Sequence, residues 1–167
     1  ISNIPGAAIG LGLVTVVGQC MGARDHKQAR RYTRMLVGIA YLVMAVSNLA
    51  VFLLGKPLIA YYNVSAEASA MAWEVLVTYC VACVIIWPAS FTVPNALRAA
   101  GDAKFTMGIS MFSMWIFRIG FSYVLGSWMQ MGLAGVWLAM EIDWVVRAAF
   151  FLLRFRGHRW EQARVIE

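Results

Sequence analysis

The sequence predicts an all-α protein, a polytopic transmembrane helix bundle with five spans. Hydrophobic residues make up 62% of the 167 residues and charged residues only 13%. Soluble domains average about 45–50% hydrophobic residues and about 25% charged residues. The apolar residues also gather in long runs, each close to the roughly 20 residues that a helix needs to cross hydrocarbon. A soluble fold, a disordered chain and a nucleic-acid-binding domain are therefore poor fits, despite the net charge of +6.

The five apolar runs define the expected spans in chain order. They cover residues 4–23, 35–54, 75–97, 105–127 and 132–153. The first three runs contain no ionised side chain, whereas the last two do. We expect one domain, a helix bundle over residues 1–155, followed by a basic cytoplasmic tail over residues 156–167.

The charges between the runs predict the orientation of the chain. Basic residues crowd the first connection and the tail, and the third connection contains Arg98 and Lys104. The fourth connection, residues 128–131, has no charge. The positive-inside rule places the first connection, the third connection and the tail in the cytoplasm, so the chain begins outside. An outside start, an odd number of spans and no initiating methionine predict a fragment of a longer multi-pass protein of the plasma membrane.

Glycines lie at multiples of four residues along the first run, at Gly6, Gly10, Gly18 and Gly22, with Val14 in the gap. A helix face without side chains lets a neighbouring helix approach closely. We expect such a face here, serving either static packing or sliding between neighbours.

Two prolines, Pro88 and Pro94, interrupt the third run. Each removes a backbone donor and favours a bend or a break in the helix. The break is either a passive kink or a place where freed carbonyl groups face a solute pathway.

The last two runs contain ionised residues at membrane depth: Arg118, then Glu141, Asp143 and Arg147. Each costs up to about 2.5–3.5 kcal/mol at the bilayer centre, so pairing or hydration is required. Asp143 and Arg147 are four residues apart and can pair on one helix face. A rise of about 1.5 Å per residue puts Arg118 level with Glu141 and Asp143. We therefore expect one ionic cluster, either a static clamp or a charge relay.

The sequence contains no glycine-rich phosphate loop, metal-ligand cluster or nucleophile triad. We accordingly expect neither an enzyme nor a cofactor or metal site. The cysteine pair Cys80 and Cys83 lies among apolar residues of the third run, where a redox role has little support.

The first run contains Val17-Gly18-Gln19 followed by Gly22-Ala23, and Pro94 is followed by Leu97-Arg98-Ala99-Ala100-Gly101-Asp102. These two stretches and part of the last two runs resemble the multidrug and toxic compound extrusion (MATE) transporters. The first is similar to the family pattern VGQ…GA…A, and the second resembles P…LRGAGD. Arg118, Gly135-Val136-Trp137, Asp143 and Arg147 are similar to the last two helices of the family. The resemblance covers nearly the whole chain, and its positions in the first two stretches include Gly18, Gln19, Gly22, Pro94, Arg98, Gly101 and Asp102.

The resemblance implies helices eight to twelve of a twelve-helix antiporter that exports cationic amphipathic compounds in exchange for sodium ions or protons. Its implied partners are membrane lipids, the missing amino-terminal bundle and small cationic drugs or dyes, with no nucleic acid. Some family members carry a cation-binding aspartate where this chain has Trp87-Pro88. The coupling ion therefore stays unassigned. Candidates for the substrate or ion pathway are Arg118, Glu141, Asp143, Arg147, Trp87, Pro88, Phe91 and Met114.

Two other functions remain open at this point. One is a flippase for lipid-linked saccharides with a related two-bundle design. The other is a membrane scaffold without transport activity, in which the charged cluster only assembles helices.

Overall fold

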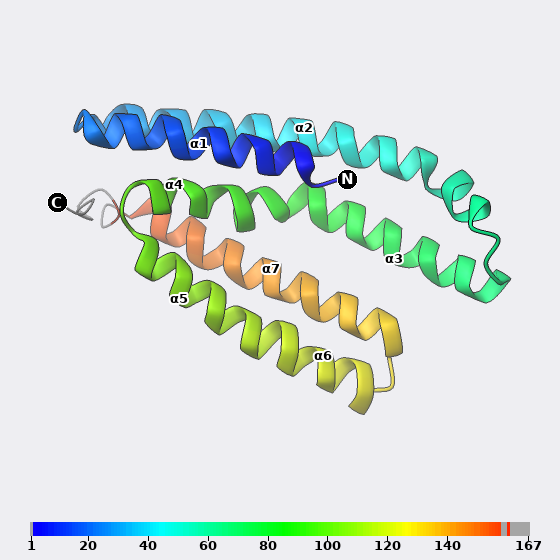
Figure 1. Cartoon of the computed structure of the whole chain (residues 1–167). Helices are drawn as coiled ribbons and strands as arrows, with labels where there is room; N and C mark the ends of the chain where they lie inside the picture. The colour runs from blue at the N-terminus through cyan, green and yellow to red at the C-terminus, as the bar shows by residue number, and fades with distance from the viewer. Residues whose placement is uncertain (1, 158–159, 161–167) are drawn as a thin grey trace.

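The computed structural model describes residues 2–157 and Trp160, and the described part is helical with no strand. Figure 1 shows three layers. One outer layer is the hairpin of α1 (Ile4–Gly22) and α2 (His26–Tyr61). The middle layer is the broken segment of α3 (Ala66–Ile85), η1 (Pro88–Thr92) and α4 (Val93–Ala99).

The other outer layer is a second hairpin, of which α7 (Gly132–Arg156) is the returning arm. Its first arm is one continuous helical rod in four parts: α5 (Ala103–Ser113), η2 (Met114–Gly120), α6 (Phe121–Tyr123) and η3 (Val124–Trp128). The middle layer contacts both hairpins, because α4 packs on α1 and η1 packs on α7. This arrangement is the all-α transmembrane bundle that the composition predicts.

Local sequence signals explain where the helices begin. The Asp25 side chain accepts a hydrogen bond from the Gln28 amide at 2.9 Å, at the start of α2. Ser65 accepts one from the Ala68 amide at 3.3 Å, at the start of α3. Such side-chain caps satisfy amide groups that have no partner within the first helical turn. The connections between α1, α2 and α3 are consequently short and well defined.

Three of the apolar runs fall almost entirely within helices that are long and apolar enough to cross a membrane: α1, α2 and the rod of residues 103–128. The helix α3 also meets these criteria, but it contains only residues 75–85 of the third run. Among the described helices, α7 is also long, at 25 residues. It falls outside that set because every 18-residue stretch of it contains three or more ionised side chains. Most of the expected basic tail, including His158, lies outside the described residues.

The second helix is longer than the run that predicted it. It has 36 residues, including Pro57, which at 1.5 Å per residue is about 54 Å. The expected run of residues 35–54 forms its middle, and the basic residues of the first connection form its first turns. The charged connection is therefore helix, and only the turn at residues 23–25 reverses the chain.

Large apolar side chains cover the outside of the bundle. Leu11, Leu42 and Leu53 expose 71%, 66% and 67% of their surface. The interior is thin and consists of two clusters. One lies at the end where α4 meets α1 and α7, around Val17, Leu97 and Phe151. A bundle with this much apolar surface needs lipid as its solvent.

Pro88 interrupts the third segment as expected. The α-helix α3 ends at Ile85, and residues 88–92 form a π-helical turn before α4 begins. Pro94 lies in the first turn of α4, directly after the π-helical turn. Pro88 and Pro94 are both buried at the centre of the bundle. The interruption places the residues that follow Pro88 against α7.

The expected single glycine face on α1 is wrong. A side-chain carbon at Gly6 would meet the Trp87 ring and the Met44 sulfur, and one at Gly10 would meet Asn95. No described atom lies within 4 Å of such a carbon at Gly18 or Gly22. With about 3.6 residues per turn, each step of four turns the position by about 40°. Gly22 therefore faces nearly opposite to Gly6, and of these glycines only Gly6 and Gly10 make close contact with other segments.

Candidate functional site

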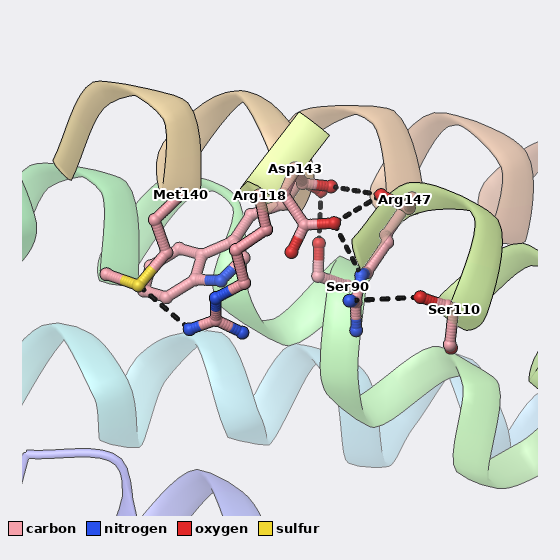
Figure 2. A network of polar contacts seen from close by, with 8 residues as sticks. Ser90, Ser110, Arg118, Met140, Asp143 and Arg147 are labelled. Carbon is pink, nitrogen blue, oxygen red and sulfur yellow. Dashed lines mark hydrogen bonds and ion pairs between the residues drawn. The ribbon is translucent and has the colours of Figure 1, made fainter. Parts of the chain in front are cut away.

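The centre of α7 contains an ion pair inside the bundle. The Arg147 Nε donates to Asp143 Oδ1 at 2.9 Å. Asp143 is fully buried, and Arg147 is 9% exposed. The pair is the one that the spacing of four residues predicts, and Figure 2 shows it between the helices. A buried carboxylate of this kind is stable only when its charge is compensated.

Three serines tie this ion pair to the neighbouring helices. Ser113 of α5 donates to Asp143 Oδ1, and Ser90 of η1 donates to the Trp144 carbonyl oxygen. The Arg147 Nη2 donates to the Ser110 carbonyl oxygen at 3.2 Å (Figure 2). The hydrogen bonds of the pair thus join α7 to α5 within the second hairpin, while Ser90 joins the middle layer to α7 beside the pair.

Several polar atoms near the pair have no hydrogen-bond partner in the described part of the chain. The second carboxylate oxygen of Asp143 is one, and the Thr92 hydroxyl and the Trp144 indole nitrogen are others. Such buried atoms are costly unless something satisfies them. The free Asp143 oxygen can accept a proton or contribute to cation binding. No group of three His, Cys, Asp or Glu side chains among the described residues is arranged to hold a metal ion.

Aromatic rings surround the ion pair on the side of the middle layer. Trp87 and Phe91 stack with ring centroids 5.1 Å apart, and Phe91 meets Trp144 edge-on at 5.8 Å. The Arg147 guanidinium lies 5.9 Å from the Phe91 ring centroid, within cation–π range. Trp87 in turn packs where Gly6 leaves room on α1. Three of the predicted pathway residues, Trp87, Phe91 and Arg147, are therefore in one contiguous group.

The expected ionic cluster with Arg118 is wrong. The Arg118 Nη2 lies 2.9 Å from the Met140 sulfur, and Arg118 forms no ion pair with a described acid. The predicted depth is right to within a turn, because Met140 is one residue from Glu141. The predicted face of α7 is wrong, because the side chains of consecutive helical residues point about 100° apart. Figure 2 shows the guanidiniums of Arg118 and Arg147 directed to separate partners.

Glu141 and Met114 do not join the group around Asp143. Glu141 is half-buried, and its Oε1 is buried without a partner among the described residues. Met114 is 37% exposed on η2, and Trp115 beside it is 62% exposed. These two side chains of η2 face outward from the bundle, away from the ion pair.

A second ion pair, which the sequence did not predict, lies near the end of α7. Arg154 donates from Nε and Nη2 to the two carboxylate oxygens of Asp102, at 2.7 and 3.2 Å. The Arg154 guanidinium also lies 4.7 Å from the Phe105 ring centroid. Gly101 has a φ of +92°, which a glycine adopts at little cost. The Gly101-Asp102 pair therefore reverses the chain and supplies the acid that holds α7.

The other motif positions fall at two places in the bundle. Pro94 is buried in α4, and Arg98 is exposed in its last turn. Gln19 borders a cavity of about 440 Å³ between α1 and α2. Gly18 and Gly22 face away from close neighbours. The first motif thus lies on the α1–α2 hairpin and the second at the junction of α4, α5 and α7.

The serines that contact α7 are site residues that the spacing of the charged residues does not indicate. Thr106, Ser110 and Ser113 recur at intervals of four and three, so they share a face of α5. That polar face in an apolar helix is the signal that could have identified the partner of Asp143. The Asp102–Arg154 pair joins residues 52 positions apart, and no local spacing indicates it.

Comparison with known proteins identifies relatives of this bundle. The MatE family model matches residues 1–124. The uncharacterized transporter YisQ of Bacillus subtilis is 31% identical over 162 residues, which covers 94% of this chain and 34% of YisQ. The probable multidrug resistance protein NorM of Thermotoga maritima is 25% identical over 169 residues, covering 99% of this chain and 36% of the relative.

A NorM from Rhodopseudomonas palustris is 26% identical over 147 residues, covering 83% of this chain and 30% of the relative. The chain thus spans about a third of the length of these relatives. No solved structure matches it. The apolar helices and these relatives make the chain a multi-pass protein of the plasma membrane. The matched model, together with the ordered motifs on α1 and at the α4–α5 turn, shows that the chain belongs to the MatE family of multidrug and toxic compound extrusion proteins.

Proposed function

We propose that this chain is the carboxy-terminal part of a secondary active exporter, which moves cationic or amphipathic compounds out of the cell in exchange for sodium ions or protons. The observation that carries the proposal is the family match over residues 1–124. Relatives described as probable multidrug resistance proteins support the substrate class. The amino-terminal part of the transporter would be the partner of the bundle described above.

The proposed topology has α7 as the fifth span. Its buried charges support this assignment, because Asp143 and Arg147 compensate each other and need no water. The connection between α1 and α2, the turn between α4 and α5 and the end of α7 would then lie in the cytoplasm.

Within this bundle, we assign Asp143 to charge compensation during transport. Its free oxygen can take up a proton or cation, which would weaken its hold on Arg147 and change the contacts of α7. Such a local change alters transport only if the two global states bind the ion with different affinity. Trp87 and Phe91 would transmit it to α1.

The test is dye export by the complete gene product in bacteria that lack their own exporters. Cells that express it should accumulate less ethidium than cells with an empty vector. Collapse of the proton gradient and removal of the sodium gradient, applied separately, should identify the coupling ion as the one whose loss abolishes export. Ethidium accumulation equal to the vector control, with both gradients intact and the protein in the membrane, would refute the proposal.

A further inference from the structure

Two neighbouring cavities share a wall where the first turns of α7 face α3. The smaller has a volume of about 280 Å³ and lies between α3 and the start of α7. The larger has about 870 Å³ and extends between α2, α3 and α7. Val75, Leu133 and Trp137 line both cavities. The two spaces therefore meet at the Trp137 side chain.

The smaller cavity contains a carboxylate without a counter-ion. Glu74 lines it and is exposed, and it forms no ion pair with a described residue. The Thr78 hydroxyl donates to the backbone carbonyl of Glu74 at 2.8 Å, and this hydrogen bond does not involve the Glu74 carboxylate. Met71 and Met131 line the same space with polarisable sulfur. One negative charge thus faces a cavity with aromatic and thioether walls.

The larger cavity offers a complementary apolar space. Leu54, Leu58 and Leu76 line it, together with Trp137. Tyr79 holds the Trp137 ring by an edge-to-face contact with centroids 5.6 Å apart. A ligand that bridges both spaces would place its charged part near Glu74 and its apolar part beyond Trp137.

From this geometry we propose that Glu74 and Trp137 form a binding site for an organic cation with an apolar body. A small inorganic cation is strongly hydrated, and one carboxylate does not replace its water shell. An organic cation is weakly hydrated and gains from the indole face as well as from the carboxylate. Glu74 comes directly before the third apolar run, so the site lies at the membrane boundary. The site would serve the exported compounds, and in that respect it rests on the proposed function.

The test measures ethidium binding to the complete protein, purified in dodecyl maltoside, whose headgroup has no charge. Glu74→Gln removes the charge with little change of shape and should raise the dissociation constant about 5- to 10-fold. Trp137→Leu should raise it about 3- to 10-fold by removing the cation–π contact. Glu67→Gln is the matched control, because Glu67 is an exposed acid of the same helix and lines neither cavity.

An anionic probe keeps the result specific. Tetraphenylborate should bind Glu74→Gln at least as well as the unmodified protein, since the substitution removes a repulsive charge. Equal weakening of both probes in a folded Glu74→Gln protein would show that Glu74 does not act through its charge, and would overturn the assignment to Glu74. Equal ethidium affinity of Glu74→Gln and Glu67→Gln would overturn it as well.

Choline lipids carry the same cationic chemistry and are a second source of ligand. Addition of diheptanoylphosphatidylcholine distinguishes the two sources: competition with ethidium assigns the site to lipid headgroups, and no competition assigns it to soluble cations. Ethidium export that fails while Glu74-dependent binding persists would refute the proposed function alone. Export and binding that both survive Glu74→Gln unchanged would refute the site alone.

Discussion

Single residues inside this bundle are stabilised through the partners that their helices bring to them. Asp143 has Ser113 and Arg147, while Arg118 has the Met140 sulfur. The difference between the two arginines is one of burial, because Arg147 is 9% exposed and Arg118 is half-buried. The energetic importance of the two residues should differ accordingly.

Asp143→Asn should destabilise the bundle by about 3–5 kcal/mol, because it leaves the Arg147 charge buried without a counter-charge. The double variant Asp143→Leu with Arg147→Met should recover most of this loss, since no charge is then buried. Unfolding in mixed micelles, followed by circular dichroism, measures both effects.

Arg118→Met is the control for that series. It removes a half-buried guanidinium with no acidic partner among the described residues, so it should change the free energy of unfolding by less than about 1 kcal/mol. A loss as large as that of Asp143→Asn would contradict our assignment of the buried pair.

The Asp102–Arg154 pair fixes the end of α7 with a fork of two hydrogen bonds. Arg154→Lys keeps the charge but cannot form the planar two-bond contact. We expect it to cost about 1 kcal/mol and to speed amide exchange in the last turns of α7. Arg156→Lys, at an exposed position two residues on, should leave that exchange unchanged; equal acceleration in both variants would contradict the role of the fork.

At the scale of helices, two glycines in the first half of α1 let that helix approach the interruption of the third segment closely. Gly6 and Gly10 lie against Trp87 and Asn95, which flank the π-helical turn η1. The turn and the glycines therefore form one interface between the outer and middle layers.

Gly6→Ala should cost about 1–3 kcal/mol, because the new methyl group would lie 2.8 Å from the Met44 sulfur and would overlap the Trp87 ring. Gly18→Ala is the matched control on the same helix. It has open space and should stabilise α1 by up to about 1 kcal/mol. Chemical unfolding measures the free energy of unfolding of both variants. Equal losses of stability in the two variants would mean that the close contact at Gly6 does not affect stability.

Much of the architecture could be predicted from the sequence, because helix length and apolar composition are local properties. The Asp143–Arg147 pair also followed from local spacing. The partner of Arg118 did not, since depth in the membrane says nothing about the direction in which a helix face points. The prediction of a single glycine face on α1 was wrong for the same reason. The Asp102–Arg154 contact could not be predicted, because it depends on how distant segments of the chain meet.

At the scale of the whole molecule, the two hairpins expose large apolar side chains and bring basic residues of α2 and α7 together at one end. Arg30 of α2 donates to the Gly157 carbonyl oxygen at 3.2 Å, and Trp160 stacks on Phe155 at the same end. The start of α2 and the end of α7 therefore lie together, as the positive-inside rule requires of two cytoplasmic segments.

Cysteine labelling in intact cells checks the proposed orientation. In a variant without the native cysteines Cys20, Cys80 and Cys83, Glu67→Cys should react with a membrane-impermeant maleimide from outside. Lys27→Cys should react only after the membrane is opened, because the basic connection faces the cytoplasm. The reverse pattern would invert the topology.

The length of α2 has a consequence for the lipid around the protein. Hydrocarbon is about 30 Å thick, so the helix exceeds it by about 24 Å. The apolar run of α2 begins at Met35, so in the proposed orientation the turns of α2 before Met35 stand among the cytoplasmic headgroups. Lys27, Arg31 and Arg34 there form a positively charged collar that attracts anionic phospholipids by about 1 kcal/mol per basic side chain.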